Sequence, residues 1–101
     1  MALDKRVALV TGGSRGLGRG IVIALANAGF DVAFTYNTDV KAAELVIKET
    51  RHAQGKILAF QMDVGSRSSI RTTIKSITRE YRGINILVNN AGIAQEKPFE
   101  T

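Results

Sequence analysis

Short apolar runs alternate with longer helix-like stretches along the chain, and this alternation constrains the fold more than any other feature. The apolar runs lie at residues 7–10, 31–36, 56–62 and 84–88. The helix-like stretches between them are about 18–28, 40–54 and 66–81. A glycine follows each of these stretches and is expected to end the helix: Gly29, Gly55 and Gly83. Such a regular succession predicts an α/β fold, with four parallel strands and three helices arranged in βαβ units.

A glycine-rich turn, residues 11–18, joins the first apolar run to the first helical stretch. Glycines let backbone N–H groups approach a ligand, and a helix start presents unpaired donors with partial positive charge. Two further turns, at 63–64 and 89–92, follow the third and fourth apolar runs. Because the carboxyl ends of parallel strands meet at one edge of a sheet, the three turns predict one binding edge that accepts an anionic diphosphate.

Composition narrows the class of protein. A chain of 101 residues allows a single domain, and the absence of cysteine excludes disulfides and thiolate chemistry. The net charge is +5, and the densest basic cluster has near-helical spacing, without interleaved aromatics: Arg67, Arg71, Lys75, Arg79 and Arg82. This spacing favours a solvated helix face over a nucleic-acid surface. No apolar run approaches the ~20 residues that span a bilayer, and the first residues lack the apolar segment of a signal peptide. We therefore predict a cytoplasmic protein that binds neither nucleic acid nor membrane.

The motifs in the three turns resemble those of the short-chain dehydrogenase/reductase family. The family's T-G-x-x-x-G-x-G motif matches Thr11, Gly12, Gly16 and Gly18. Its aspartate after the third strand matches Asp63, and its N-N-A-G motif matches residues 89–92. The chain is similar to the amino-terminal portion of such enzymes, most of all to bacterial β-ketoacyl-acyl-carrier-protein reductases of fatty acid biosynthesis. This resemblance implies that residues 1–101 are the dinucleotide-binding, Rossmann-type portion of a single domain that continues beyond residue 101.

The resemblance also implies a cofactor site built from all three turns. The pyrophosphate turn would be shaped by Gly12, Gly16, Leu17 and Gly18. Asp63 would accept a hydrogen bond from the adenine amino group, and the Val64 backbone would meet the same ring. The ribose beside the nicotinamide would be bordered by Asn90, Ala91 and Gly92. Asn89 and Thr11 would tie the strand ends together. Structural roles stay open, because Asp63 can cap the following turn and asparagines can satisfy backbone groups in a tight turn.

Charge at the end of the second strand bears on the choice of cofactor. Enzymes that select NAD usually hold the ribose 2′-hydroxyl with an acidic residue there, but here that position falls at Tyr36. Asp39 lies too far along to match. A 2′-phosphate needs a cation instead, and Arg15 in the glycine turn can make a forked contact, with Ser14 and Asn37 as helpers. We therefore predict NADP(H), against the alternative that Arg15 is simply a solvated turn residue.

Catalytic groups are not found in this sequence. The family reduces ketones with a tyrosine, a lysine four residues later, a serine and an asparagine, but Tyr36 is followed at that spacing by Val40 and Tyr81 by Asn85. His52, the only histidine, is expected on a helix and has no second histidine with which to bind a metal. We predict no catalytic and no metal-binding residue in the chain, which would be inactive alone.

Two functions remain open at this point. In the first, the chain is the NADP(H)-binding part of a homo-oligomeric oxidoreductase that transfers a hydride between NADPH and a small keto or acyl-carrier-bound substrate. In the second, it is a non-catalytic nucleotide-binding module that completes its sheet with another chain. For both functions we expect the fourth strand to have a hydrophobic, unpaired edge.

Overall fold

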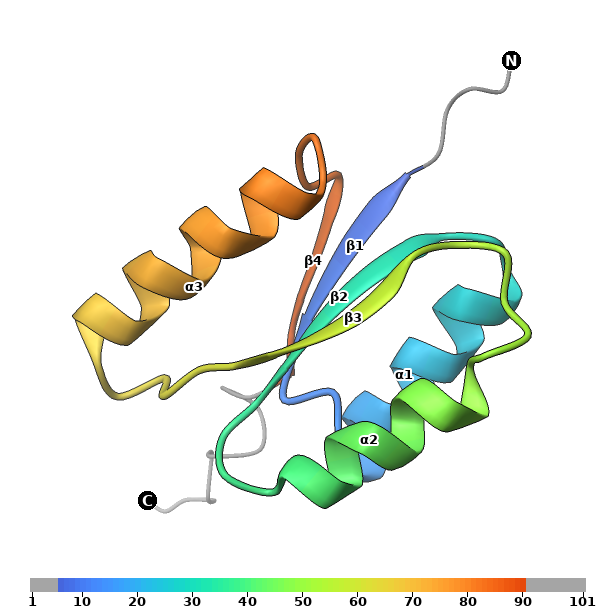
Figure 1. Ribbon diagram of the computed structural model, residues 1–101, viewed down its shortest axis with the longest axis horizontal. Helices are drawn as coiled ribbons and strands as arrows, with labels where there is room; N and C mark the ends of the chain where they lie inside the picture. Colours follow the sequence, from blue (N-terminus) through green and yellow to red (C-terminus); the bar gives the residue numbers. More distant parts are fainter. Residues whose placement is uncertain (1–5, 91–101) are drawn as a thin grey trace.

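A computed structural model describes residues 6–90 and contains one parallel sheet with helices on both faces (Figure 1). In chain order the elements are β1 (Val7–Thr11), α1 (Gly16–Asn27), β2 (Asp31–Tyr36), α2 (Val40–Glu49), β3 (Ile57–Gln61), α3 (Arg67–Glu80) and β4 (Ile86–Asn89). The strand order is β3-β2-β1-β4, and every pairing between neighbours is parallel. The predicted Rossmann-type fold is therefore confirmed.

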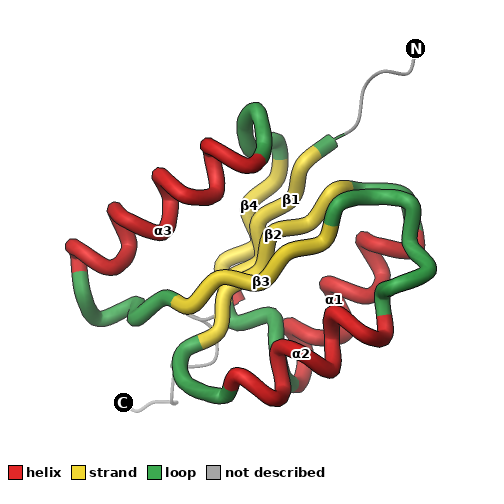
Figure 2. The backbone as a smooth tube through the Cα atoms, viewed as in Figure 1, coloured by secondary structure: helices red, strands yellow, loops and turns green. Residues whose placement is uncertain are grey.

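Two hydrophobic cores lie on opposite faces of the sheet, because successive side chains of a strand point to opposite sides. Helices α1 and α2 cover one face and α3 covers the other (Figure 2). The first core is centred on Val10, Phe34, Val22 and Val46, which join β1 and β2 to α1 and α2. The second core joins the strands to α3 and consists of Val7, Leu9, Ala33, Ile77 and Tyr81. The sheet is thus covered on both faces, as parallel sheets require.

Tyr81 closes the core beneath α3, as its place in the apolar stripe of that helix predicts. Its ring is buried, and its hydroxyl donates to the main-chain oxygens of Val32, at 2.9 Å, and Lys56, at 2.8 Å. Burial, followed by the nearby charge of Asp31, raises the pKa of the Tyr81 phenol well above its ordinary value. The phenol therefore stays neutral and serves as a structural hydrogen-bond donor.

Only one of the three glycines predicted to end helices does so by adopting a left-handed conformation. Gly29 has a φ of 94°, and its N–H donates to Ala26, as expected for the residue after a helix. Gly55 instead allows a close approach, since a Cβ there would lie 2.1 Å from the Phe30 carbonyl oxygen. Gly83 is not the cap of α3, because the cap is Tyr81 and Arg82 lies between the two. The prediction that these two glycines end their helices was therefore wrong, because α2 ends at Glu49 and α3 at Glu80.

Helix α2 is shorter than predicted. It ends at Glu49 rather than near residue 54, with Thr50 as its cap. The buried Thr50 hydroxyl donates to the carbonyls of Val46 and Ile47, and such local bonds compete with continuation of a helix. His52, expected on this helix, lies in the turn beyond it, where its ring Nε2 is 3.2 Å from Asn27 Oδ1.

The predicted edge strand and the predicted solvated face are both observed. Among residues 6–90, β4 is at one edge of the sheet, next to β1 only, and its Leu87 is 62% exposed. The basic residues of α3 and its following turn are all exposed: Arg67, Arg71, Lys75, Arg79 and Arg82. Within the part of the chain that the structure describes, no helix is both long enough and apolar enough to cross a membrane.

Candidate functional site

The glycine turn between β1 and α1 leaves the start of α1 open. Gly12 and Gly16 have φ values of 69° and 56°, in the left-handed region that glycine tolerates best. The cap residue Arg15 is extended and makes no side-chain bond to the helix. In contrast, Asp39 caps α2 and Ser66 caps α3. Among the described helices, only α1 therefore begins without a capping side chain, which leaves its first N–H groups open to an anion.

Thr35 of β2 and Asn90, the residue after β4, hold the turn in place. The Gly12 N–H donates to the Thr35 hydroxyl at 3.1 Å, and the Gly13 N–H donates to the Thr35 carbonyl at 2.9 Å. From the other side, the Asn90 side-chain amide donates to the Gly12 carbonyl at 2.9 Å. Thr35 and Asn90 are only 2% and 6% exposed, so these bonds are shielded from water. The turn is pre-organised rather than free to rearrange.

Two glycines of the turn are required by close packing. A Cβ at Gly18 would lie 2.0 Å from the Gly12 carbonyl oxygen and 2.5 Å from the Asn90 amide nitrogen. A Cβ at Gly13 would lie 2.7 Å from Phe34 Cβ and 2.8 Å from a methyl group of Val22. These contacts bring the start of α1 against the ends of the strands. Around Gly16, in contrast, a Cβ would meet nothing within 4 Å, so the turn has open space beside its helix start.

The expected tie between the ends of β1 and β4 is present. Thr11 pairs with Asn89 in the parallel register, and the Thr11 hydroxyl donates to Asn89 Oδ1 at 3.1 Å. The same hydroxyl lies 3.4 Å from the Val88 carbonyl oxygen. This bond confirms the structural role predicted for Thr11 and Asn89.

Arg15 reaches outward from the turn and faces an acidic side chain. Its guanidinium Nη1 lies 4.0 Å from Asp39 Oδ2, with side-chain exposures of 75% for Arg15 and 47% for Asp39. The neighbouring Ser14 is half-buried, and Leu17 is 66% exposed. A cation at the mouth of the site is thus available to a ligand, although a carboxylate stands beside it.

The second and third strands bring the other predicted residues to the same edge. Tyr36 is paired with Gln61, and the Gln61 side chain donates to the Asn37 carbonyl at 2.9 Å. Asp63 is exposed, and its Oδ1 accepts from the Gly65 N–H at 2.9 Å. This bond gives Asp63 the turn-capping role that the sequence left open. Val64 is exposed beside it.

Two of the predicted cofactor residues, Ala91 and Gly92, lie outside the described residues, and their roles stay predictions. Within residues 6–90, no group of three or more His, Cys, Asp or Glu side chains is arranged to hold a metal ion. The site that the structure brings together is therefore an edge with an open helix start, a nearby guanidinium and exposed groups at the end of β3.

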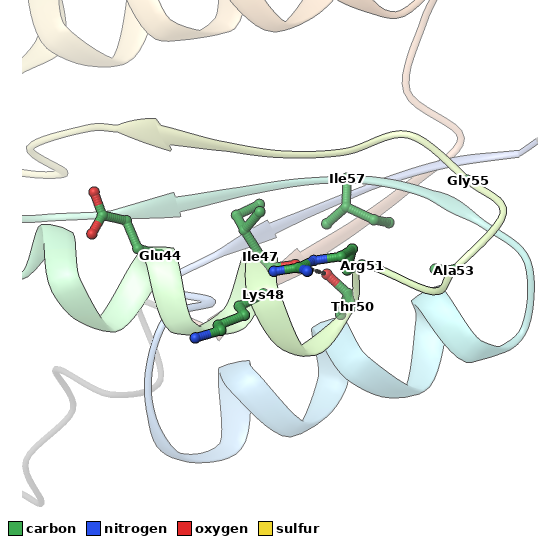
Figure 3. A pocket seen from close by; sticks show the side chains of 8 residues that line it. All are labelled: Glu44, Ile47, Lys48, Thr50, Arg51, Ala53, Gly55 and Ile57. Carbon is green, nitrogen blue, oxygen red and sulfur yellow. Dashed lines mark hydrogen bonds between the residues drawn. The ribbon is translucent and has the colours of Figure 1, made fainter.

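Hollows adjoin the sheet at two places in the part of the chain that the structure describes. One lies between the end of α2 and the start of β3, and its lining includes the charged Glu44, Lys48 and Arg51 and the apolar Ile47 and Ile57 (Figure 3). This hollow contains none of the predicted site residues. The other lies under α3 beside β4 and is mostly apolar, with Leu9, Ile74 and Leu87 in its lining. It reaches the binding edge, because Thr11, Val64 and Asn89 also line it.

The strand order and the open glycine turn at the carboxyl edge define a Rossmann-type nucleotide-binding class of fold. Solved structures agree with this class. A short-chain dehydrogenase/reductase from Serratia marcescens superposes with a TM-score of 0.81 at 38% identity, over 89% of this chain and 37% of that protein. Acetoin dehydrogenase from Enterobacter cloacae superposes with a TM-score of 0.80 at 25% identity, over 87% of this chain and 35% of that protein.

Sequence comparison identifies the family. The family model for short chain dehydrogenase matches residues 6–101, and the chain belongs to this family. Hydroxynaphthalene reductase arp2 of Aspergillus fumigatus is 35% identical over 100 residues, which cover 99% of this chain and 37% of that protein. 3-Oxoacyl-[acyl-carrier-protein] reductase FabG of Staphylococcus aureus is 37% identical over 89 residues, which cover 88% of this chain and 36% of that protein. The chain thus spans little more than a third of the length of these relatives.

Three residues of the site were missed by sequence reasoning. Thr35 and Gly13 hold the turn against β2, and Asp39 faces Arg15. Gly13 was visible as a glycine, but only its packing shows that the position has no room for a side chain. Thr35 sits within an apolar strand, where nothing in the pattern distinguishes its hydroxyl. Asp39 was set aside because its distance along the chain did not match the usual acidic position.

Proposed function

We propose that this chain binds NADP(H) and forms the cofactor half of a short-chain oxidoreductase that transfers a hydride between NADPH and a keto or hydroxy substrate. The observation that carries the proposal is the uncapped start of α1 at the glycine turn. An anion at this position would complete the hydrogen bonding of the helix start and interact favourably with the helix dipole.

The residues present fit such a cofactor. The pyrophosphate would lie against the N–H groups at the start of α1, beside Gly16, where the space is open. Arg15, Ser14 and Asn37 would contact the 2′-phosphate, since an exposed guanidinium suits a doubly charged phosphate. Asp63 and Val64 would meet the adenine, while Asn90 would hold both the turn and the nearby ribose. When bound, NADPH supplies the hydride for carbonyl reduction.

The substrate and assembly belong to the whole protein. The resemblance to 3-oxoacyl-[acyl-carrier-protein] reductase FabG of Staphylococcus aureus supports a β-ketoacyl thioester as the substrate. We further propose a role in fatty acid biosynthesis, a cytoplasmic location and a homo-oligomer for the whole protein. In this proposal residues 1–101 are one portion of a single domain, and the acid that protonates the substrate oxygen comes from residues outside them. An in-frame serine followed by Tyr-x-x-x-Lys in the coding sequence downstream of Thr101 would support this. A frame without them would support a non-catalytic nucleotide-binding module instead, for which the exposed β4 edge is the favouring observation.

Binding titration of the protein with NADPH and NADH tests the cofactor assignment. Arg15→Ala is expected to raise the Kd for NADPH about tenfold, the equivalent of about 1.4 kcal/mol, while the Kd for NADH stays the same. Arg71→Ala is the matched control, because it removes another exposed arginine, one on α3 and away from the turn. An unchanged Kd for NADPH in Arg15→Ala would contradict the assignment.

A further inference from the structure

The segment between β3 and α3, which is proposed to meet the adenine, is fastened to α3 by hydroxyl groups. The Ser69 hydroxyl oxygen accepts from the Asp63 N–H at 3.0 Å. Further along α3, the buried Thr73 hydroxyl donates to the Gln61 carbonyl at 3.2 Å. Ser66, the cap of α3, accepts from the Ser69 N–H through its side chain at 3.2 Å. Its own N–H donates to the Asp63 carbonyl at 3.0 Å. The start of α3 thus holds Asp63 at both its N–H and its carbonyl.

The carboxylate of Asp63 has one oxygen available to a ligand. Its Oδ1 accepts from the Gly65 N–H at 2.9 Å, within the same loop. Within residues 6–90, the second oxygen, Oδ2, makes no hydrogen bond and no ion pair. Because the residue is exposed, packing does not fix the direction of its side chain. The position of Oδ2 therefore depends on the backbone to which Ser69 is bonded.

We propose that Ser69 is a positioning residue for the adenine: its hydroxyl fixes the backbone of Asp63, so that Oδ2 faces the amino group of the ring. This proposal rests on the proposed function, since it concerns the same dinucleotide site. Ser69 acts through Asp63 and does not itself bind the cofactor. Because the loop is exposed, a water molecule can replace the serine as partner of the Asp63 N–H at little cost. The bond therefore adds little to stability, and its main effect is to restrict the loop to one conformation.

Titration with NADPH and with its hypoxanthine analogue, in which an oxygen replaces the adenine amino group, tests the role of Ser69. A carbonyl oxygen cannot donate a hydrogen bond to a carboxylate, so the wild-type protein is expected to bind NADPH more tightly than the analogue. Ser69→Ala is expected to raise the Kd for NADPH about three- to tenfold, as the loss of one hydrogen bond allows, and to change that for the analogue by less than about twofold. Ser69→Thr keeps the hydroxyl and should restore the wild-type ratio of the two Kd values.

Ser76→Ala is the matched control, since it removes another half-buried serine hydroxyl further along the same helix. It should leave both Kd values unchanged. An unchanged Kd for NADPH in Ser69→Ala would overturn the proposal, and so would an equal rise for both dinucleotides, which would indicate a general structural effect. A wild-type protein that bound both equally well would also overturn it, because Asp63 would then not bind the amino group, although NADPH binding would stand. If the wild-type protein bound neither dinucleotide, the proposed function itself would fail, and the role of Ser69 with it.

Discussion

Alanine in place of Gly18 should distort the binding edge, although alanine is a better helix former than glycine. The added Cβ would lie 2.0 Å from the Gly12 carbonyl oxygen, 2.5 Å from the Asn90 amide nitrogen and 2.9 Å from the Gly12 carbonyl carbon. Two of these atoms belong to the backbone of the turn, which is held on its other side by Thr35. The start of α1 must therefore move away from the strands, and the hydrogen bond between Asn90 and Gly12 must lengthen.

The expected cost follows from three contributions. Overpacking of a tight contact costs about 1–3 kcal/mol, and a weakened buried hydrogen bond adds about 1 kcal/mol. The better helix propensity of alanine returns up to about 1 kcal/mol. We expect Gly18→Ala to lower the free energy of unfolding by about 1–3 kcal/mol, a fall in Tm of about 4–8 °C for each kcal/mol.

Urea denaturation followed by circular dichroism measures this change, and the same helix supplies its control. Gly20 lies two residues further along α1, and a Cβ there would meet nothing within 4 Å. Gly20→Ala should therefore raise the free energy of unfolding by about 0.5–1 kcal/mol. Opposite signs for the two substitutions would support the role of close packing at Gly18. Equal stability of Gly18→Ala and wild type, or a loss of stability in both variants, would refute it.

Three further predictions concern the core, the turn and catalysis. Because burial raises the pKa of Tyr81 above its ordinary value of 10.0, the stability from its neutral phenol is present below pH 10.0 and is lost as the pH rises. Tyr81→Phe should cost about 1 kcal/mol at neutral pH and show a smaller loss of stability above pH 10.0; equal alkaline losses would contradict this. Thr35→Val removes the acceptor of the Gly12 N–H and should lower the urea midpoint by the equivalent of about 1–3 kcal/mol, so an unchanged midpoint would count against it. Purified residues 1–101 should show no oxidation of NADPH with a β-keto ester, because they contain no Tyr-x-x-x-Lys; steady turnover in a spectrophotometric assay would prove this wrong.

The order and type of the elements could be predicted because local patterns determine them. Apolar runs and helix periodicity identify strands and helices without any long-range information. The ends of the elements were harder to predict from the sequence, as α2 shows. Its continuation to residue 54 looked favourable, but the Thr50 hydroxyl bonds back to the carbonyls of the last turn. Gly55 was taken as a helix terminator, whereas its proximity to Phe30 depends on how two loops pack together.

Only those parts of the candidate site that consist of consecutive residues could be predicted from the sequence. The glycine turn, Asp63 and the two asparagines at the end of β4 are local motifs with a physical meaning. The contact between Arg15 and Asp39 is different in kind, because it exists only when α1 and α2 begin side by side on one face of the sheet. Spacing along the chain placed Asp39 too far along to match the usual acidic position after the second strand. In three dimensions its carboxylate lies 4.0 Å from the Arg15 guanidinium.

The bond from Asn90 to Gly12 joins residues that are 78 positions apart in the chain. The ribosome makes a chain from its amino terminus, so the residues of β1, α1 and β2 are synthesised before those of β4. The glycine turn can be closed from the β2 side by Thr35 at that stage, but its second support arrives only with residue 90. A contact of such long range is costly in loop entropy and tends to form late. The nascent chain therefore passes through a stage at which the glycine turn is present but lacks its bond from Asn90. Affinity for a dinucleotide should develop only after residue 90 has left the ribosome.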